Sequence, residues 1–107
     1  MTATVQTSAD EGSLRVAVSG EIDLANVAAV EDEIDAAVSD RLHAVSVDLT
    51  DLTYLDSAGI RMLFTLASRL QALRIMLELV VPLDSPTRRL IELSGFESLA
   101  ALRPTSH

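Results

Sequence analysis

The spacing of the apolar residues changes repeatedly along this chain, from every second residue to every third or fourth. Residues 14–19 and 44–49 alternate between apolar and polar or small side chains, as strands with one covered face do. Residues 24–39 and 57–70 carry apolar side chains three and four positions apart, as amphipathic helices do. Strands that alternate with helices of these lengths predict an α/β fold, in which amphipathic helices cover a sheet of mainly valine and leucine.

The expected sheet is mixed and has four to five strands. In chain order these are residues 4–8, 14–19, 44–49, 74–81 and 99–102. Gly20 ends the second strand, and Pro82, which cannot donate to a strand ladder, ends the fourth. Residues 10–13 have the composition of the turn in an opening hairpin, and residues 51–55 are interpreted as a connecting loop.

Helix boundaries follow from capping residues. Asp23 is the expected N-cap of the helix over residues 24–39. Ser85 and Pro86 predict the N-cap and first residue of a third helix, and Gly95 stands just past its end. Residues 103–107 are expected to form a flexible tail.

A chain of 107 residues has the length of one domain, so we expect a single core. The chain has no cysteine, which excludes disulfides and thiolate catalysis and favours a reducing cytoplasm. The N-terminus does not resemble a signal peptide. The longest apolar runs, at 63–67 and 79–83, fall far short of the roughly 20 residues that span a bilayer, so no membrane role is expected.

The formal net charge is −8, and the acidic side chains are concentrated in the first half of the chain. Nucleic-acid binding is not expected, because it needs lysine or arginine clusters opposite phosphates. Glu31, Asp32, Glu33 and Asp35 follow one another on the first helix, where consecutive residues point in different directions. We therefore interpret them as a solvated face and expect no metal.

Catalytic motifs are missing from the sequence. The histidines are His43, expected at the surface, and His107. The nucleophile elbow of hydrolases needs glycine two residues before its serine, whereas Ser57 has Leu55 there. The four glycines, at positions 12, 20, 59 and 95, cannot form a dinucleotide-binding or phosphate-binding loop. The chain is expected to be neither an enzyme nor a cofactor-binding protein.

The segment Asp56-Ser57-Ala58-Gly59 directly precedes the apolar stripe of the second helix. An Asp-Ser pair in this place is most often a cap, whose oxygens accept the free N–H groups of the first turn. The position also suits a phosphorylated serine, because a helix start offers unpaired N–H donors and the positive end of the macrodipole. Phosphate adds about −1.5 to −2 charge, enough to disrupt a docked interface. On the residues alone, both interpretations stand.

Three segments resemble the STAS family, and together they extend over nearly the whole chain. Residues 18–23 look like the family's strand-end turn, residues 47–60 like its central strand, loop and phosphoacceptor helix start, and residues 89–96 like its last helix. Within the family the resemblance is to bacterial anti-sigma factor antagonists. It implies one STAS domain over residues 1–107.

The resemblance implies a protein-binding switch. In these antagonists the serine that matches Ser57 is phosphorylated by an anti-sigma factor serine/threonine kinase. The unmodified antagonist binds that kinase and frees the sigma factor, and a PP2C-type phosphatase restores the unmodified form. By position Ser57 is the expected phosphoacceptor, and the expected partner surface comprises Asp56, Ser57, Ala58, Gly59, Gly20, Glu21 and Asp23. Gly20 and Asp23 are equally well explained as a turn and a cap.

Two other functions remain open at this point. A STAS domain can be a non-switching scaffold, such as a stressosome component or the small cytoplasmic subunit of a lipid-transport ABC complex. A small hydrolase that uses Ser57 would need a general base, which the sequence does not supply.

Overall fold

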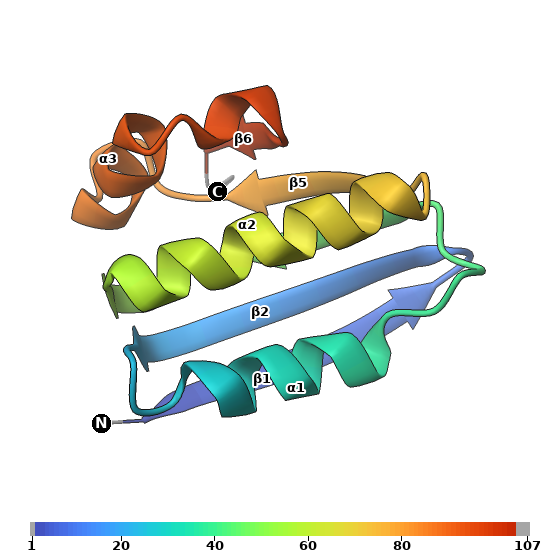
Figure 1. Ribbon diagram of the computed structural model, residues 1–107, viewed down its shortest axis with the longest axis horizontal. Helices are drawn as coiled ribbons and strands as arrows, with labels where there is room; N and C mark the ends of the chain where they lie inside the picture. Colours follow the sequence, from blue (N-terminus) through green and yellow to red (C-terminus); the bar gives the residue numbers. More distant parts are fainter. Residues whose placement is uncertain (1, 105–107) are drawn as a thin grey trace.

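The computed structural model describes residues 2–104 and places a layer of helices against a six-stranded sheet (Figure 1). The strands are β1 (Ala3–Asp10), β2 (Ser13–Ile22), β3 (Ala44–Asp48), β4 (Leu52–Leu55), β5 (Met76–Val80) and β6 (Ala101–Arg103). The helices are α1 (Val27–Ala37), α2 (Ser57–Ala72) and α3 (Pro86–Leu93), followed by the 3-10 turn η1 (Phe96–Ser98). The expected α/β class is confirmed, with more strands than the four to five predicted.

The sheet is mixed, with the strand order β1-β2-β3-β5-β6. β1 and β2 form an antiparallel hairpin, and the other pairings within residues 2–104 are parallel. β2 is long enough to pair with two strands in succession, through residues 13–17 with β3 and through residues 20–22 with β4. The N–H of Asp56 donates to the carbonyl of Ile22 at 3.3 Å, so α2 begins where β2 and β4 end.

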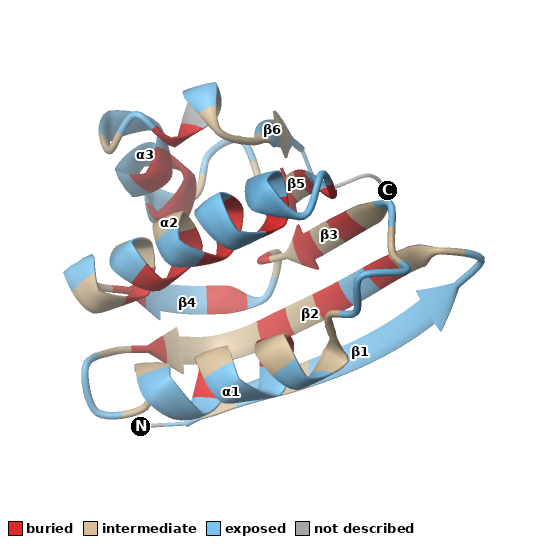
Figure 2. Ribbon diagram, turned by 45° about the vertical axis from the view of Figure 1, so that its right-hand side comes forward, coloured by how far each residue is buried: buried red, intermediate tan, exposed pale blue. Residues whose placement is uncertain are grey.

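Helices cover one face of the sheet and leave the other open (Figure 2). Along β2, Val16 and Val18 are buried on the helical side, whereas Arg15 is exposed on the other. α3 and η1 continue the helical layer beside α2, where the ring of Phe96 meets Phe64 edge to face, with ring centroids 4.9 Å apart. The period of two in the strands is therefore explained by a sheet covered on one side only.

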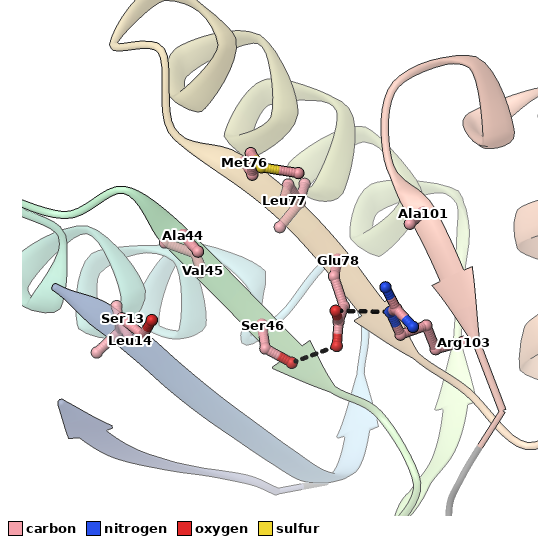
Figure 3. A pocket seen from close by; sticks show the side chains of 10 residues that line it. All are labelled: Ser13, Leu14, Ala44, Val45, Ser46, Met76, Leu77, Glu78, Ala101 and Arg103. Atoms are coloured by element: carbon pink, nitrogen blue, oxygen red, sulfur yellow. Dashed lines mark hydrogen bonds and ion pairs between the residues drawn. The ribbon is translucent and has the colours of Figure 1, made fainter. Parts of the chain in front are cut away.

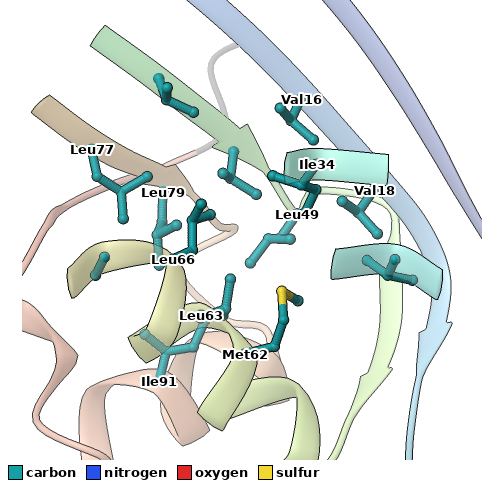
Figure 4. Close-up of a cluster of buried hydrophobic side chains, with 14 of the residues drawn as sticks. Val16, Val18, Ile34, Leu49, Met62, Leu63, Leu66, Leu77, Leu79 and Ile91 are labelled. Carbon is teal, nitrogen blue, oxygen red and sulfur yellow. The ribbon is translucent and has the colours of Figure 1, made fainter. Parts of the chain in front are cut away.

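The core lies between the sheet and the helices and is mainly aliphatic (Figure 4). Leu63 and Leu66 of α2 and Ile34 of α1 meet Val16 of β2 and Leu79 of β5 there, and all five are buried. Each fully buried aliphatic side chain gains roughly 1.5–3 kcal/mol of transfer free energy. Many such side chains compensate for a content of only 3% aromatic residues.

The boundary of β2 and the loop predicted after β3 differ from the sequence-based expectation. β2 continues past Gly20 to Ile22, with a register shift between Gly20 and Glu21. The expected loop at residues 51–55 contains β4, which pairs with this shifted end of β2. Leu52 and Leu55 are both buried although they are three positions apart, so this irregular strand lacks the alternation by which strands are recognised.

The start of α1 also differs, because Asp23 is not its N-cap. The helix begins at Val27, with Asn26 in the N-cap position. The Asp23 carboxylate accepts the N–H groups of Ala25 and Asn26 at 3.0 and 3.1 Å, so it closes a turn that precedes the helix. The helix ends at Ala37, two residues before the predicted end at Ser39.

The position of the hairpin turn and the ends of α3 agree with the prediction, whereas the hairpin strands are longer than the predicted 4–8 and 14–19. Glu11 and Gly12 have φ angles of 48° and 85°, the left-handed pair typical of a two-residue hairpin turn. Ser85 caps α3 by accepting the N–H of Arg88 at 3.0 Å, with Pro86 as the first helical residue. Gly95 lies beyond the helix with a φ of 81°.

The last strands are offset from their predicted positions. β5 begins at Met76 because Arg74, with a φ of 59°, still belongs to the turn after α2. β6 includes Arg103, which was expected in the tail and pairs with Glu78 of β5 at 2.8 Å. Residues 105–107, the end of the expected tail, lie outside the described residues.

Candidate functional site

Ser57 is the first residue of α2 and is exposed to solvent. Only Asp56 separates it from β4, so α2 begins at the edge of the sheet where the parallel strands β2 and β4 end (Figure 2). Within residues 2–104 its hydroxyl makes no hydrogen bond. A group attached to this oxygen would therefore break no internal interaction.

Asp56 caps α2 and also holds the neighbouring turn. One carboxylate oxygen, Oδ1, accepts the N–H groups of Ala58 and Gly59 at 2.9 and 3.2 Å. The other, Oδ2, accepts the N–H of Leu24 at 3.2 Å. The capping interpretation of this segment is therefore correct for Asp56. The expectation of unpaired donors at the helix start needs correction for residues 58 and 59, whose N–H groups Asp56 already occupies.

Gly59 allows the first turn of α2 to approach the ends of β2 and β4. It is buried, and a Cβ atom at this position would lie 2.2 Å from Cδ1 of Leu55 and 3.1 Å from Cγ2 of Ile22. Ala58, between Ser57 and Gly59, is half-buried. Within the motif, Gly59 thus has a structural role and Ser57 is the residue exposed to solvent.

The turn after β2 lies beside this helix start. Leu24 joins it to Asp56, and Asp23 is the adjacent residue. Gly20 and Glu21 lie in β2 itself, where Gly20 has a φ of 91° and passes so close to the Thr2 carbonyl that a Cβ would be 2.4 Å from that oxygen. Glu21 is half-buried, and its Oε1 lacks a hydrogen-bond partner among the described residues. The structure thus brings Asp23 next to Asp56, whereas Gly20 shapes the strand.

Leu24 is a surface residue that the sequence reasoning missed. It was included in the predicted helix, but it lies in the turn before α1 and its side chain is 79% exposed. Leu83, in the loop after β5, is also largely exposed. A single exposed aliphatic side chain is common on protein surfaces, and Leu24 is singled out here because its backbone N–H is bonded to Asp56, the cap of the helix that Ser57 begins. The sequence did not indicate that Leu24 is exposed in a turn, because Leu24 fits the helical period of the residues that follow.

Other candidate groups lie away from Ser57. His43 is exposed, as expected, and its N–H donates to the carbonyl of Gly12 at the start of β2, at the opposite end of the sheet from Ser57. In the predicted acidic face of α1, Asp35 pairs with Arg69 at 2.6 Å. The described residues contain no cluster of three or more potential metal ligands. None of the described helices is long and apolar enough to span a bilayer.

A pocket of about 240 Å³ lies on the open face of the sheet, at the start of β3 and β5 (Figure 3). Met76 and Ala44 line one end of it. At the other end Glu78 accepts from the Ser46 hydroxyl at 3.4 Å and pairs with Arg103. These polar groups bond to one another across strands β3, β5 and β6, and the pocket is separate from the Ser57 edge.

The family comparison agrees with this architecture. The model of the STAS domain matches residues 4–107. The chain therefore belongs to the STAS domain family. Its relatives include the anti-sigma-F factor antagonist RsfB of Mycobacterium tuberculosis. The two sequences are 32% identical over 105 residues, which make up 97% of this chain and 84% of RsfB. Within the family, the chain is grouped with the anti-sigma factor antagonists, which are regulators and not enzymes.

Solved structures show the same fold. An anti-sigma factor antagonist from Mycobacterium paratuberculosis superposes with a TM-score of 0.86 at 32% identity, over 97% of this chain and 87% of that one. SpoIIAA in its unphosphorylated form gives a TM-score of 0.73 at 18% identity, over 96% and 90% of the two chains. Bacillus SpoIIAA in its phosphorylated form gives 0.74 at 19% identity, over 97% and 93%. At these identities SpoIIAA supports the fold alone.

Proposed function

We propose that this protein is a phosphorylation-controlled anti-sigma factor antagonist acting in the cytoplasm. Its unphosphorylated form binds an anti-sigma factor that is a serine/threonine kinase, and this binding frees the sigma factor. Phosphorylation of Ser57 by the kinase releases the antagonist, and a PP2C-type phosphatase restores it. The observation that carries the proposal is the exposed, unbonded hydroxyl of Ser57 beside the exposed side chain of Leu24.

The group transfer needs only the hydroxyl from this chain. The Ser57 Oγ attacks the γ-phosphorus of ATP held by the kinase, and its proton passes to a base of the kinase. The Oγ–P bond forms as the bond between that phosphorus and the ADP oxygen breaks. In the phosphatase reaction a water oxygen bonds to the phosphorus, the Oγ–P bond breaks, inorganic phosphate leaves and Oγ regains a proton.

The added charge acts on the docking surface more than on the fold. A phosphate adds about −1.5 to −2 charge next to Leu24, whose side chain a partner would bury. Burying such a charge in an interface without a matched cation costs on the order of several kcal/mol. Because the Ser57 hydroxyl has no bond within the described part of the chain, its modification removes none of the contacts that stabilise α2.

The test is a binding measurement with candidate anti-sigma factor kinases, made with and without ATP. ATP should abolish binding of the wild type and leave Ser57→Ala bound, and mass spectrometry should find one phosphate, on Ser57. Ser57→Glu should weaken binding only in part, because one carboxylate has less charge than phosphate. Ser68→Ala, an exposed serine later in α2, is the matched control and should behave as the wild type.

Two outcomes would overturn the switch. One is the loss of binding by Ser57→Ala when ATP is added. The other is affinity purification that returns a transporter ATPase in place of a kinase-type anti-sigma factor, which would favour a non-switching scaffold.

A further inference from the structure

Arg61 lies one helical turn beyond Ser57, on the exposed stripe of α2. Ser57, Arg61 and Thr65 are all exposed and follow one another at intervals of four residues. Helix residues four apart have Cβ atoms about 5–6 Å apart. Because Cα–Cβ bonds tilt toward the N-terminus of a helix, the Cα–Cβ bond of Arg61 is directed toward the turn that contains Ser57.

The guanidinium of Arg61 has no acidic partner in the described part of the chain. Helix α2 contains no aspartate or glutamate, and its other arginine, Arg69, pairs with Asp35 of α1. The residue four positions after Arg61 is Thr65, whose hydroxyl binds the Arg61 carbonyl at 3.0 Å. The residue four positions before it is Ser57. Arg61 is therefore free to bind an anion that arrives at Ser57.

A phosphate on Ser57 would gain from this cation, because the N–H groups of Ala58, Gly59 and Ile60 at the helix start are occupied. Asp56 accepts the N–H groups of Ala58 and Gly59, and the N–H of Ile60 donates to the Asp56 carbonyl at 3.1 Å. Two carboxylates are linked to the start of α2. Asp56 precedes Ser57 in the chain, and Asp23 precedes Leu24, whose backbone N–H donates to Asp56. A dianion at Ser57 would thus directly follow the Asp56 carboxylate in the chain, with Arg61 as the cation on its stripe.

We propose that Arg61 is the intramolecular counter-ion of phosphorylated Ser57. Its planar guanidinium donates two hydrogen bonds to phosphate oxygens, with the anion N-terminal to the cation, the favourable order on a helix. This inference rests on the proposed phosphorylation of Ser57. Phosphorylation would then change the docking surface in two ways. The surface gains a phosphate, and the N–H donors of Arg61 are no longer free to bind a partner.

The test uses protein that carries phosphoserine at position 57, installed during translation by stop-codon suppression, so no kinase is needed. The pKa of the second phosphate ionisation, about 6 in peptides, is measured by ³¹P NMR titration. In Arg61→Gln this pKa should be higher by about 0.5, because the dianion loses a surface ion pair. Arg61→Lys should give an intermediate value. At about 1 M salt the difference should shrink, since screening then acts within roughly 3 Å.

Arg41→Gln is the matched control, because Arg41 is exposed in the loop before β3, at the opposite end of the sheet from Ser57. Its phosphate pKa should equal that of the wild type. Equal values for the wild type and Arg61→Gln would overturn the ion pair, and so would an equal rise in Arg41→Gln, which would indicate a general charge effect. A kinase that leaves Ser57 unmodified would overturn the proposed function alone, since the phosphoserine in this experiment does not depend on a kinase.

Discussion

The carboxylate of Asp56 accepts a hydrogen bond from the backbone N–H of Leu24, a residue 32 positions earlier in the chain, at 3.2 Å. The same carboxylate caps α2 through Ala58 and Gly59. One side chain therefore fixes the position of the helix that begins with Ser57 and of the turn that exposes Leu24. This polar contact joins the two parts of the proposed docking surface.

Replacing Asp56 should loosen this unit. Asp56→Ala removes the acceptor of three backbone N–H groups, so the free energy of unfolding should fall by about 2 kcal/mol, the upper range for loss of an N-cap. Asp56→Asn should recover only the capping part of this loss, because its single amide oxygen can accept the N–H groups of Ala58 and Gly59 but its NH2 group cannot accept that of Leu24. Urea denaturation measures both values. Asp40→Ala, in an exposed loop, is the control and should change the free energy by less than about 0.5 kcal/mol. An equally small change in Asp56→Ala would contradict the capping role.

Leu24 should matter for binding and not for stability. Its side chain is 79% exposed, so Leu24→Ser should leave the melting temperature unchanged while weakening affinity for the anti-sigma factor about tenfold, as expected for an interface residue worth about 1.4 kcal/mol. Met76→Ser is the matched control, since Met76 is 76% exposed but lies at the start of β5, on the open face of the sheet. Equal affinities for Leu24→Ser and Met76→Ser would place the docking surface elsewhere.

Gly59 should resist any side chain. In Gly59→Ala the added Cβ would meet Leu55 at 2.2 Å, so overpacking should outweigh the gain in helix propensity and lower stability by about 1 kcal/mol. The cause is tested by a double-mutant cycle with Leu55→Ala, which removes the clashing atoms. In the Leu55→Ala background the cost of Gly59→Ala should vanish or reverse. Additive effects in this cycle would show that the destabilisation has another origin.

The sequence predicted those elements whose signal is local. The strand at residues 44–49 alternates regularly, and α3 is delimited by Ser85, Pro86 and Gly95, whose backbone preferences act on their immediate neighbours. β4 was missed because its burial depends on a shifted pairing with β2, and the spacing of Leu52 and Leu55 has no strand period. Long-range pairing of this kind leaves no mark on the segment itself.

The candidate site was predictable to a similar extent. The motif that contains Ser57 could be found because a capping aspartate and a helical stripe are neighbours in sequence. The assignment of Asp23 as a cap failed because its carboxylate closes a turn that precedes the helix, and the Asn26 side chain, in the N-cap position, donates to the Glu21 carbonyl at the end of β2 and does not cap the helix. The contact of Leu24 with Asp56 joins two distant segments, so local patterns could not indicate it.

Arg88 should be among the most important charged residues for stability. It is 8% exposed, its Nη1 donates to the Val81 carbonyl at 2.8 Å, and its Nε pairs with Glu92 at 3.1 Å, so it joins α3 to the end of β5. Arg88→Ala leaves the Val81 carbonyl without this donor and opens space beneath α3, which should cost about 3 kcal/mol. Arg69→Ala breaks an ion pair whose two side chains are both 41% exposed, and it should cost less than about 1 kcal/mol. Chemical denaturation of the two variants under the same conditions measures both losses in the free energy of unfolding. Similar losses would show that burial does not determine how much an arginine stabilises this fold.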